Sequence, residues 1–163
     1  MSAANAEIME IVSTLKGKAP WGVRLGHGSF VTMEFGDPDP RAGGRVIHGE
    51  WHLWLYMCNW RIEAKHRIFA GSNDDRKAIE ATLGDLSFDS IESIDVIQPS
   101  LDLSIQFRSG IRILTFSSSS DHDEEEWKLF TPGGKCLLAY GDGTYEYARS
   151  DEPSPRTSGG PEA

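Results

Sequence analysis

The most apolar stretch of this chain is residues 46–62, which reads VIHGEWHLWLYMCNWRI. Because successive side chains of a β-strand point to opposite faces, the stretch divides into two sets. One set is Trp51, Leu53, Leu55 and Met57, and the other is His52, Trp54, Tyr56, Cys58 and Trp60. Both faces carry large apolar or aromatic side chains. This predicts a central strand that is covered on both sides, or one that is covered on one side and offers aromatic side chains on the other. Helical spacing also fits part of the stretch, but its aromatic enrichment favours a strand.

The sequence before this stretch predicts a short helix and a β-hairpin. Residues 8–15 carry apolar side chains at helical spacing behind an expected cap at Asn5. Residues 21–35 alternate with period two around a turn, which is typical of a hairpin. A Gly- and Pro-rich loop at residues 36–44 follows. The helix is too short to stand alone, so we expect it to dock on the rest of the domain.

The sequence after the stretch predicts one more helix and a series of strands. Ser72 and Asp75 have the spacing of a capping box ahead of apolar residues at helical spacing, and Gly84 is the expected stop. Strand-like runs follow at residues 91–96, 101–107, 111–116, 127–130, 136–140 and 144–148. Most of these runs can pair with their sequence neighbours as hairpins. Together these elements predict an α+β fold, with a mostly antiparallel sheet of about eight strands and two short helices.

Length and charge limit the classes of protein that this chain can belong to. Its 163 residues fit a single domain at residues 1–149, followed by a Pro/Ser/Gly-rich tail at residues 150–163 that we expect to be disordered. Lys and Arg total 16 against 25 Asp and Glu, which gives a net charge of −9. This charge argues against nucleic acid as a partner, because a nucleic-acid binder needs a basic face. No apolar run approaches the roughly 18 residues that span a bilayer, so no membrane association is expected.

The cysteines and the N-terminus favour an intracellular, non-nucleophilic protein. The first residues lack the basic and apolar segments of a secretory signal, which makes the cytoplasm the expected location. Two cysteines, Cys58 and Cys136, are too few for a disulfide-stapled secreted domain, and we expect both to be reduced. Cys58 lies in the most apolar run, where burial makes a thiol inert, and no Gly-x-Ser-x-Gly motif is present. We therefore predict no catalytic residue.

The best metal candidate in the sequence is His48-Gly49-Glu50-Trp51-His52. On a strand, side chains two residues apart lie about 6.6 Å from each other, so one adjacent pair could share a metal. His48 and His52 would lie about 13 Å apart, which is too far for bonds of about 2 Å to one zinc ion. A third ligand would have to come from His27, His66 or His122. The spacing favours hydrogen-bonded histidines at a strand start, and we predict no bound metal and no cofactor.

Two features of the sequence point instead to a binding surface. Residues 121–126 carry five formal negative charges in six positions. This pattern is typical of a solvated loop, or of an acidic surface that attracts a basic partner. Three tryptophans fall between residues 51 and 60, and exposed Trp and Tyr side chains dominate interface hot spots. The predicted binding residues are Trp54, Tyr56, Trp60, Asp121, Asp123, Glu124, Glu125 and Glu126.

Three parts of the chain together carry a resemblance. Residues 49–54 read GEWHLW, a hairpin is expected across residues 101–116, and an acidic loop leads into Trp127-Lys128-Leu129. With this layout, residues 21–148 resemble the small acidic α+β immunity proteins found beside bacterial polymorphic toxins, or a related bacterial family of unknown function. Immunity proteins of that kind bind and neutralise a partner toxin without doing chemistry, so the resemblance implies a non-enzymatic role.

The function that these observations favour is a non-enzymatic, cytoplasmic protein-binding module. Its acidic surface would hold a basic partner protein, with a toxin as the most specific candidate. The alternative is a small-ligand or metal-binding enzyme with a pocket on the sheet, lined by His48, Glu50, His52 and His66. A third interpretation is self-association through an exposed sheet edge.

Overall fold

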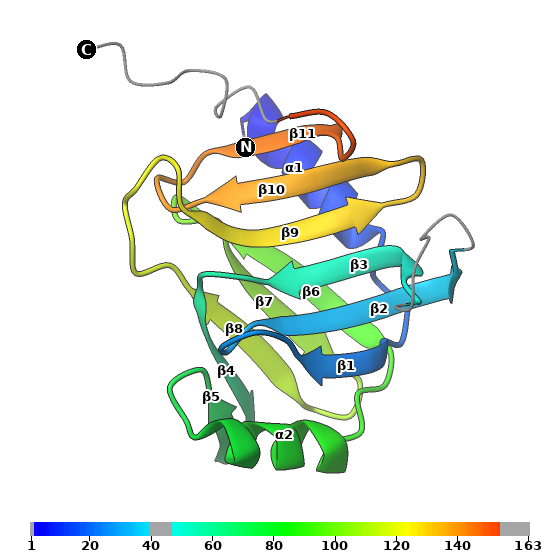
Figure 1. Cartoon of the computed structure of the whole chain (residues 1–163), viewed down its shortest axis with the longest axis vertical. Coiled ribbons are helices and arrows are strands. Elements are labelled where there is room, and N and C mark those ends of the chain that lie inside the picture. The colour runs from blue at the N-terminus through cyan, green and yellow to red at the C-terminus, as the bar shows by residue number, and fades with distance from the viewer. Residues whose placement is uncertain (1, 40–46, 154–163) are drawn as a thin grey trace.

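The computed structural model describes residues 2–39 and 47–153, and these residues form two antiparallel sheets and two helices (Figure 1). The six-stranded sheet runs in the order β1 (Trp21–Leu25), β2 (Val31–Pro38), β3 (Gly49–Leu55), β9 (Glu125–Thr131), β10 (Lys135–Tyr140) and β11 (Tyr145–Arg149). The five-stranded sheet runs in the order β5 (Arg67–Gly71), β4 (Asn59–Ala64), β8 (Arg112–Phe116), β7 (Asp102–Phe107) and β6 (Ile91–Ile97). The predicted α+β class with two helices and antiparallel pairing is confirmed. The prediction of one sheet with about eight strands is wrong.

The main difference from the sequence prediction lies within residues 46–62. This stretch is not one strand, because β3 ends at Leu55 and β4 begins at Asn59 in the other sheet. Between them the chain turns around the backbone carbonyl of Glu126, which accepts hydrogen bonds from the amides of Tyr56, Met57 and Cys58 at 2.9, 3.2 and 3.3 Å. One apolar stretch thereby supplies a central strand to each sheet.

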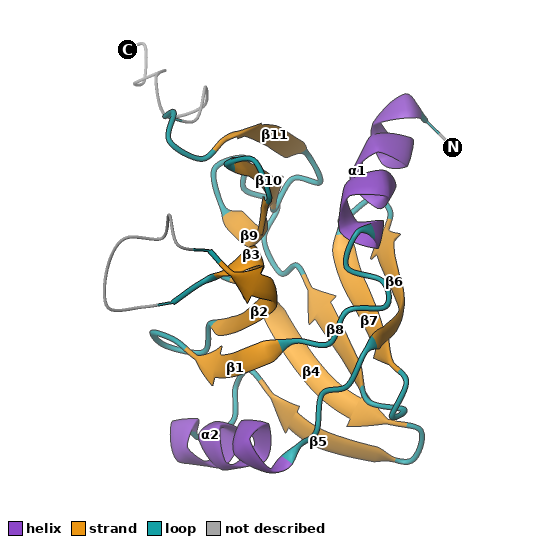
Figure 2. Ribbon diagram, turned by 90° about the vertical axis from the view of Figure 1, so that its right-hand side faces the viewer, coloured by secondary structure: helices purple, strands orange, loops and turns teal. Residues whose placement is uncertain are grey.

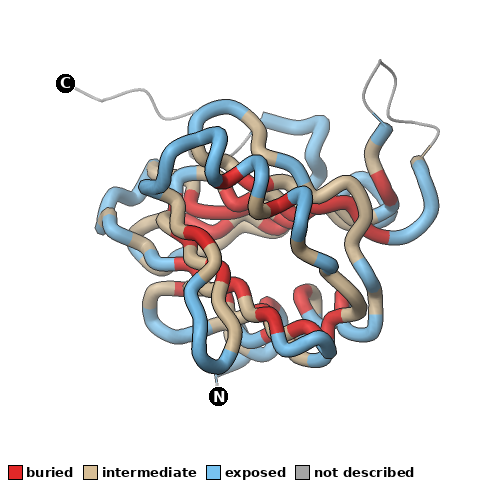
Figure 3. Tube along the Cα trace, turned by 90° about the horizontal axis from the view of Figure 1, so that it is seen from below, coloured by how far each residue is buried: buried red, intermediate tan, exposed pale blue. Residues whose placement is uncertain are grey.

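The hydrophobic core lies between the two sheets, and buried segments line the inside of both (Figure 3). Its largest fully buried side chains come from both layers, with Phe35 and Trp127 on the six-stranded sheet and Trp60 and Phe107 on the five-stranded sheet. Inward-facing residues alternate with outward-facing ones along the strands, as expected where two sheets pack face to face. The core therefore fixes which side chains β2, β3 and β9 present on the outer face.

Helix α1 (Ala3–Ser13) lies against β6, as Figure 2 shows. Its cap is Ser2, whose hydroxyl accepts a hydrogen bond from the Asn5 amide at 3.2 Å, so the predicted cap at Asn5 is wrong by three residues. The apolar stripe of the helix is buried, with Ile8 and Val12 both at most 1% exposed. This burial supplies the docking that a short helix needs for stability.

Helix α2 (Arg76–Asp85) contacts β1 and β5. Asp75 caps it by accepting a hydrogen bond from the Lys77 amide at 3.1 Å. Ser72 is not its cap, because the Ser72 hydroxyl accepts from the Trp60 amide at 3.0 Å instead. Gly84 lies inside the last turn and does not end the helix. Within residues 2–39 and 47–153, neither helix is long and apolar enough to cross a membrane.

The predicted domain ends close to where the described residues end. Residues 150–153 follow β11 as turns and bends, and most of the predicted tail, residues 154–163, lies outside the described residues. The later part of the expected loop, residues 40–46, also lies outside them.

Cross-strand register sets out the outer face of the six-stranded sheet in two rows. One row pairs Trp21, Glu34, His52 and Phe130 across β1, β2, β3 and β9. The neighbouring row pairs Arg24, Thr32, Trp54 and Lys128 across the same strands. Side chains directly opposite each other in such a ladder lie within reach of one another. Charged, imidazole and aromatic groups are therefore gathered on one face.

Candidate metal centre

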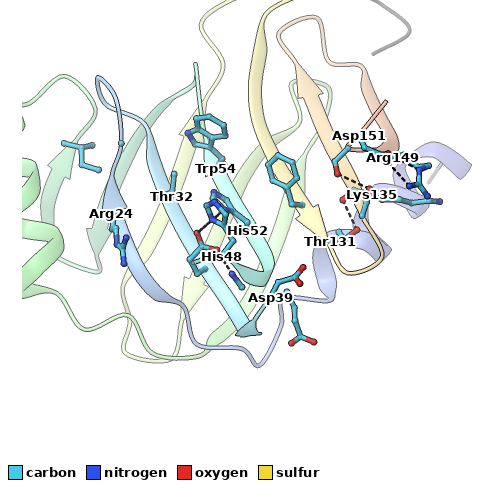
Figure 4. Close-up of a pocket in the computed structure, with 18 residues that line it drawn as sticks. Arg24, Thr32, Asp39, His48, His52, Trp54, Thr131, Lys135, Arg149 and Asp151 are labelled. Atoms are coloured by element: carbon cyan, nitrogen blue, oxygen red, sulfur yellow. Dashed lines mark hydrogen bonds and ion pairs between the residues drawn. The ribbon is translucent and has the colours of Figure 1, made fainter. Parts of the chain in front are cut away.

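A cavity of about 860 Å³ lies on this outer face (Figure 4). Its wall includes Glu34 from β2, His52 and Trp54 from β3, and Phe130 from β9. His48, which precedes β3, completes the part of the wall where side chains converge. The volume is in the range of pockets that hold small molecules.

Three potential metal ligands meet in this cavity. The Nδ1 atoms of His48 and His52 lie 2.9 and 3.0 Å from Oε1 of Glu34, and 2.8 Å from each other. These three atoms form a nearly equilateral triangle, and Figure 4 shows His48 and His52 side by side in the cavity wall. The side chains of Glu34 and His52 are 7% and 12% exposed, whereas that of His48 is 38% exposed. The triangle is thus buried on two sides and reachable at the third.

Local backbone geometry brings His48 to the other two residues. The pairing of β2 with β3 is irregular between Phe35 and Pro38, where the chain bulges. Gly49 lies directly over this irregularity, and a Cβ atom there would collide with the carbonyl oxygen of Phe35. The Gly49 amide donates a hydrogen bond of 2.9 Å to Oε2 of Glu34. Glycine at position 49 therefore permits the close approach that anchors Glu34 and positions His48.

The large separation of His48 and His52 expected from the sequence is wrong. A fully extended strand would place His48 and His52 about 13 Å apart. Their Nδ1 atoms are 2.8 Å apart, and His48 lies before the first residue of β3. The two imidazole rings are tilted by 53° to each other, with their centroids 4.5 Å apart.

Hydrogen atoms fit the three atoms of the triangle only with crowding or with one unfavourable contact. If both Nδ1 atoms carried hydrogen, the two N–H groups would converge on one carboxylate oxygen with their hydrogens in conflict, because the nitrogens are 2.8 Å apart. If only one carried hydrogen, the lone pair of the other would face a carboxylate oxygen at about hydrogen-bond distance. A positive ion that accepts all three lone pairs removes this conflict.

The carboxylate of the cluster is suited to act as an anionic ligand. Burial pushes the pKa of Glu34 upward, but hydrogen bonds from His52, from the Gly49 amide and from His48 outweigh it, so the pKa lies below its ordinary value. Nε2 of His52 is buried and has no hydrogen-bond partner among the described residues. Its ring meets Phe130 edge-on at 5.6 Å. His52 therefore presents only Nδ1 to the cavity.

Sequence reasoning did not select Glu34, and it selected Glu50 instead. Glu50 lines the cavity, but its Oε2 accepts a hydrogen bond from the Asp37 amide at 2.9 Å, outside the triangle. Among the other histidines, His66 is exposed in the turn between β4 and β5, and His122 pairs with Asp142 at 2.7 Å. The signal that could have found Glu34 is its phase in β2, since it alternates with the apolar residues of the core face.

The predicted aromatic binding residues are separated by the fold. Trp54 and Tyr56 lie half-buried on the outer face with rings 5.0 Å apart, and Nζ of Lys128 lies about 5 Å above each ring. Trp60 is 2% exposed in the core, where its Nε1 donates to the Ser29 carbonyl at 2.7 Å. Trp60 is thus not available at the surface, because it belongs to β4 of the other sheet.

The predicted acidic binding residues do not form one exposed strip. Asp121 and Asp123 are exposed, while Glu124 and Glu125 are half-buried. Glu125 forms an ion pair of 2.6 Å with Lys128. Glu126 is 3% exposed, because it lies inside the chain turn between the two sheets. Only the first part of the run can meet a partner without rearrangement.

The two cysteines are free thiols. Burial raises the pKa of the Cys58 thiol, and burial also raises the pKa of Cys136 to about 12. Neither is poised as a thiolate nucleophile, since reactive cysteines have a lowered pKa. The outer face of the six-stranded sheet is therefore the part of the described chain where the geometry supports chemistry. Comparisons with protein-family models, with curated proteins and with solved structures returned no match for this chain.

Proposed function

We propose that this chain is a metal-dependent, small-molecule-binding protein with Glu34, His48 and His52 as its metal ligands. The observation that carries the proposal is the triangle of Oε1, Nδ1 and Nδ1 atoms, whose edges measure 2.9, 3.0 and 2.8 Å. Ligand atoms that surround one transition-metal ion at about 2.0–2.2 Å lie at comparable distances from each other. The ion would sit above the triangle, on the side of the cavity.

The donor set indicates the class of ion. Two imidazole nitrogens and one carboxylate oxygen suit Zn²⁺, Fe²⁺ or Co²⁺, whereas Ca²⁺ and Mg²⁺ prefer oxygen ligands. Three protein ligands on one side of an ion leave coordination positions for water or for a bound molecule. This is the arrangement of metal sites that bind or activate a small ligand, as opposed to closed structural sites with four protein ligands.

The surroundings of the ligands support a binding role over a purely structural one. The cavity of about 860 Å³ is much larger than a metal ion needs. Trp54 and Phe130 give it an apolar wall next to the ligands. Gly49 secures Glu34 from behind, so the ligand geometry is set in advance. A small molecule would bind against this wall with a donor atom on the ion.

The test is metal stoichiometry in the full chain. We expect one equivalent of Zn²⁺ or Co²⁺ by calorimetry and elemental analysis, and loss of binding in His48→Ala and His52→Ala. His66→Ala is the matched control, because His66 is exposed and lies in the turn of the other sheet. Circular dichroism would verify that the variants fold. Absence of a stoichiometric ion in the wild-type chain, or equal binding in all three variants, would overturn the proposal.

A further inference from the structure

We infer that the ligand of this metal centre is a small organic acid, whose carboxylate is held by Arg24 while a second donor atom binds the ion. This inference rests on the proposed function, since it needs the ion at Glu34, His48 and His52. It adds the class of ligand and the residue that selects it.

Arg24 is placed beside the ligands by the register of β1 on β2. It lies opposite Thr32, in the row next to the one that holds Glu34 and His52. Nη2 of Arg24 and Cγ of Glu34 each lie 3.6 Å from the position that a Cβ atom on Gly22 would take. The two atoms are therefore at most twice that distance apart, and Gly22, with φ +61°, leaves the space between them free of a side chain.

Arg24 has an unused charge. It is exposed, and it forms no hydrogen bond or ion pair with any residue in the described ranges. The other cations around the cavity are engaged, because Arg149 bonds Asp151 at 2.8 and 3.0 Å and Lys135 lies over the ring of Tyr147. A guanidinium presents its donors in a fork that matches both oxygens of a carboxylate. Arg24 is thus the group to which an anionic ligand would bind.

The charge balance of the centre also calls for an anion. A divalent ion with Glu34 as its single carboxylate ligand keeps a net positive charge, to which Arg24 adds another. Glu50 also lines the cavity and keeps its negative charge, but its Oε2 accepts a hydrogen bond from the Asp37 amide, outside the triangle. Opposite charges within a few ångströms in a partly desolvated cleft attract strongly. A ligand with one negative charge near Arg24 and a donor on the ion would offset the positive charges of Arg24 and the ion.

The walls of the cavity define the rest of the ligand. Trp54 and Phe130 flank His52 on β3 and β9, and their rings lie 6.3 and 5.6 Å from its ring. Thr32 offers a hydroxyl between Arg24 and Trp54 in the same row. Apolar walls with a few convergent polar groups are typical of small-molecule sites. A compact acid with an apolar or aromatic body fits this set better than a polyphosphate, which would need several free cations.

Cobalt absorption tests the inference with salicylate as the probe. Protein loaded with one equivalent of Co²⁺, and freed of excess ion by gel filtration, is titrated while the d–d bands are recorded. We expect salicylate to shift the bands in the wild-type chain, and its affinity to fall about tenfold or more in Arg24→Met, with a smaller loss in Arg24→Lys, which keeps the charge without the fork. Salicylamide, which lacks the carboxylate, should bind Arg24→Met and wild type equally.

The controls separate failure of this inference from failure of the proposed function. Arg67→Met is the matched variant, because Arg67 is an exposed arginine on β5 of the other sheet, stacked over Phe69. If Co²⁺ does not bind, the metal centre itself is refuted. If Co²⁺ binds but salicylate leaves the bands unchanged, or binds equally well to Arg24→Met, the metal centre stands and the role of Arg24 is refuted.

Discussion

The outer faces of the two sheets each hold a carboxylate between two basic side chains, and the two clusters differ in kind. On the five-stranded sheet, Glu63 bonds Nε of Arg61 at 2.7 Å and also pairs with Arg112. On the six-stranded sheet, Glu34 meets His48 and His52 at similar distances. Distance alone does not distinguish the clusters, although their chemistry does.

The difference lies in the protons that the basic groups carry. Guanidinium groups are always protonated and only donate, so every contact at Glu63 joins a donor to an acceptor. Hydrogen bonds from Arg112 and Arg61 accordingly lower the pKa of Glu63. Each imidazole has one lone pair and one N–H when neutral, so the Glu34 cluster either crowds two N–H donors on one oxygen or leaves a lone pair facing that oxygen. The first cluster is complete without a ligand, whereas under the proposed function the second would be completed by a positive ion.

The largest effect should come from exchanging one carboxylate for an amide in each cluster. A complete zinc site contributes about 10–16 kcal/mol over four ligands, or about 3 kcal/mol for each ligand, so Glu34→Gln should weaken metal binding by a factor on the order of a hundred. Glu63→Gln should leave metal affinity unchanged and cost about 1 kcal/mol of stability, because its arginine partners are 38% and 43% exposed.

Competition with a coloured chelator would measure the metal affinities, and urea unfolding would measure the stability. Glu63→Gln serves here as the matched control, since both substitutions remove one charge from a carboxylate held between two basic groups. Equal metal affinities in the two variants would show that the comparison between the clusters is mistaken.

A third carboxylate, Glu126, extends the comparison because it is buried and forms no ion pair with a basic side chain among the described residues. Its two oxygens have no hydrogen-bond partner among the described residues. Burial raises the pKa of Glu126 to about 7; the Ser117 hydroxyl opposes this rise, and the charges of Glu124 and Asp102 add to it. The folded state therefore holds the proton more tightly than the unfolded state does.

Stability should consequently fall as the pH rises through this range. The contribution of Glu126 is full below its unfolded pKa of about 4.5 and is lost as the pH passes about 7, a change of about 3 kcal/mol. Glu126→Gln cannot ionise, so it should be the more stable form at pH 8.5 and lose this advantage at pH 4.5. Urea unfolding of both proteins at the two pH values measures the difference, and parallel pH profiles would exclude a buried, titrating Glu126.

The division of residues 46–62 shows how far local patterns specify this fold. The alternation of Leu53 and Leu55 correctly predicts a core-facing strand, because burial of one face is a local property. The turn at Tyr56 depends on the carbonyl of Glu126, which lies 70 residues further along the chain. A partner so distant in sequence leaves no local pattern, so one strand in place of two was the natural prediction.

For a similar reason, the sequence pointed to only two of the three residues of the candidate site, His48 and His52, and not to Glu34. The pair His48 and His52 attracts attention as a motif, but their approach needs the irregular pairing of β2 with β3 and the absence of a side chain at Gly49. Glu34 joins them through cross-strand register, which is set by packing of the whole sheet. An acidic residue on the outer face of a strand is ordinary in a sequence, and only its neighbours in space make Glu34 a candidate ligand.

The smallest effect concerns the basic partner that the sequence predicts, which stays a prediction. It now depends on Asp121 and Asp123, the exposed residues of the acidic run. If a basic protein is captured from the native host at low salt, Asp121→Asn with Asp123→Asn should slow its association several-fold and weaken the salt dependence of the rate. Asp85→Asn with Asp95→Asn makes the same change of charge at exposed positions outside the run. Equal rates for the two double variants would mean that the captured partner responds only to the net charge of the protein. The acidic run would then have no specific role in recognition, just as the arginine-paired Glu63 has none in metal binding.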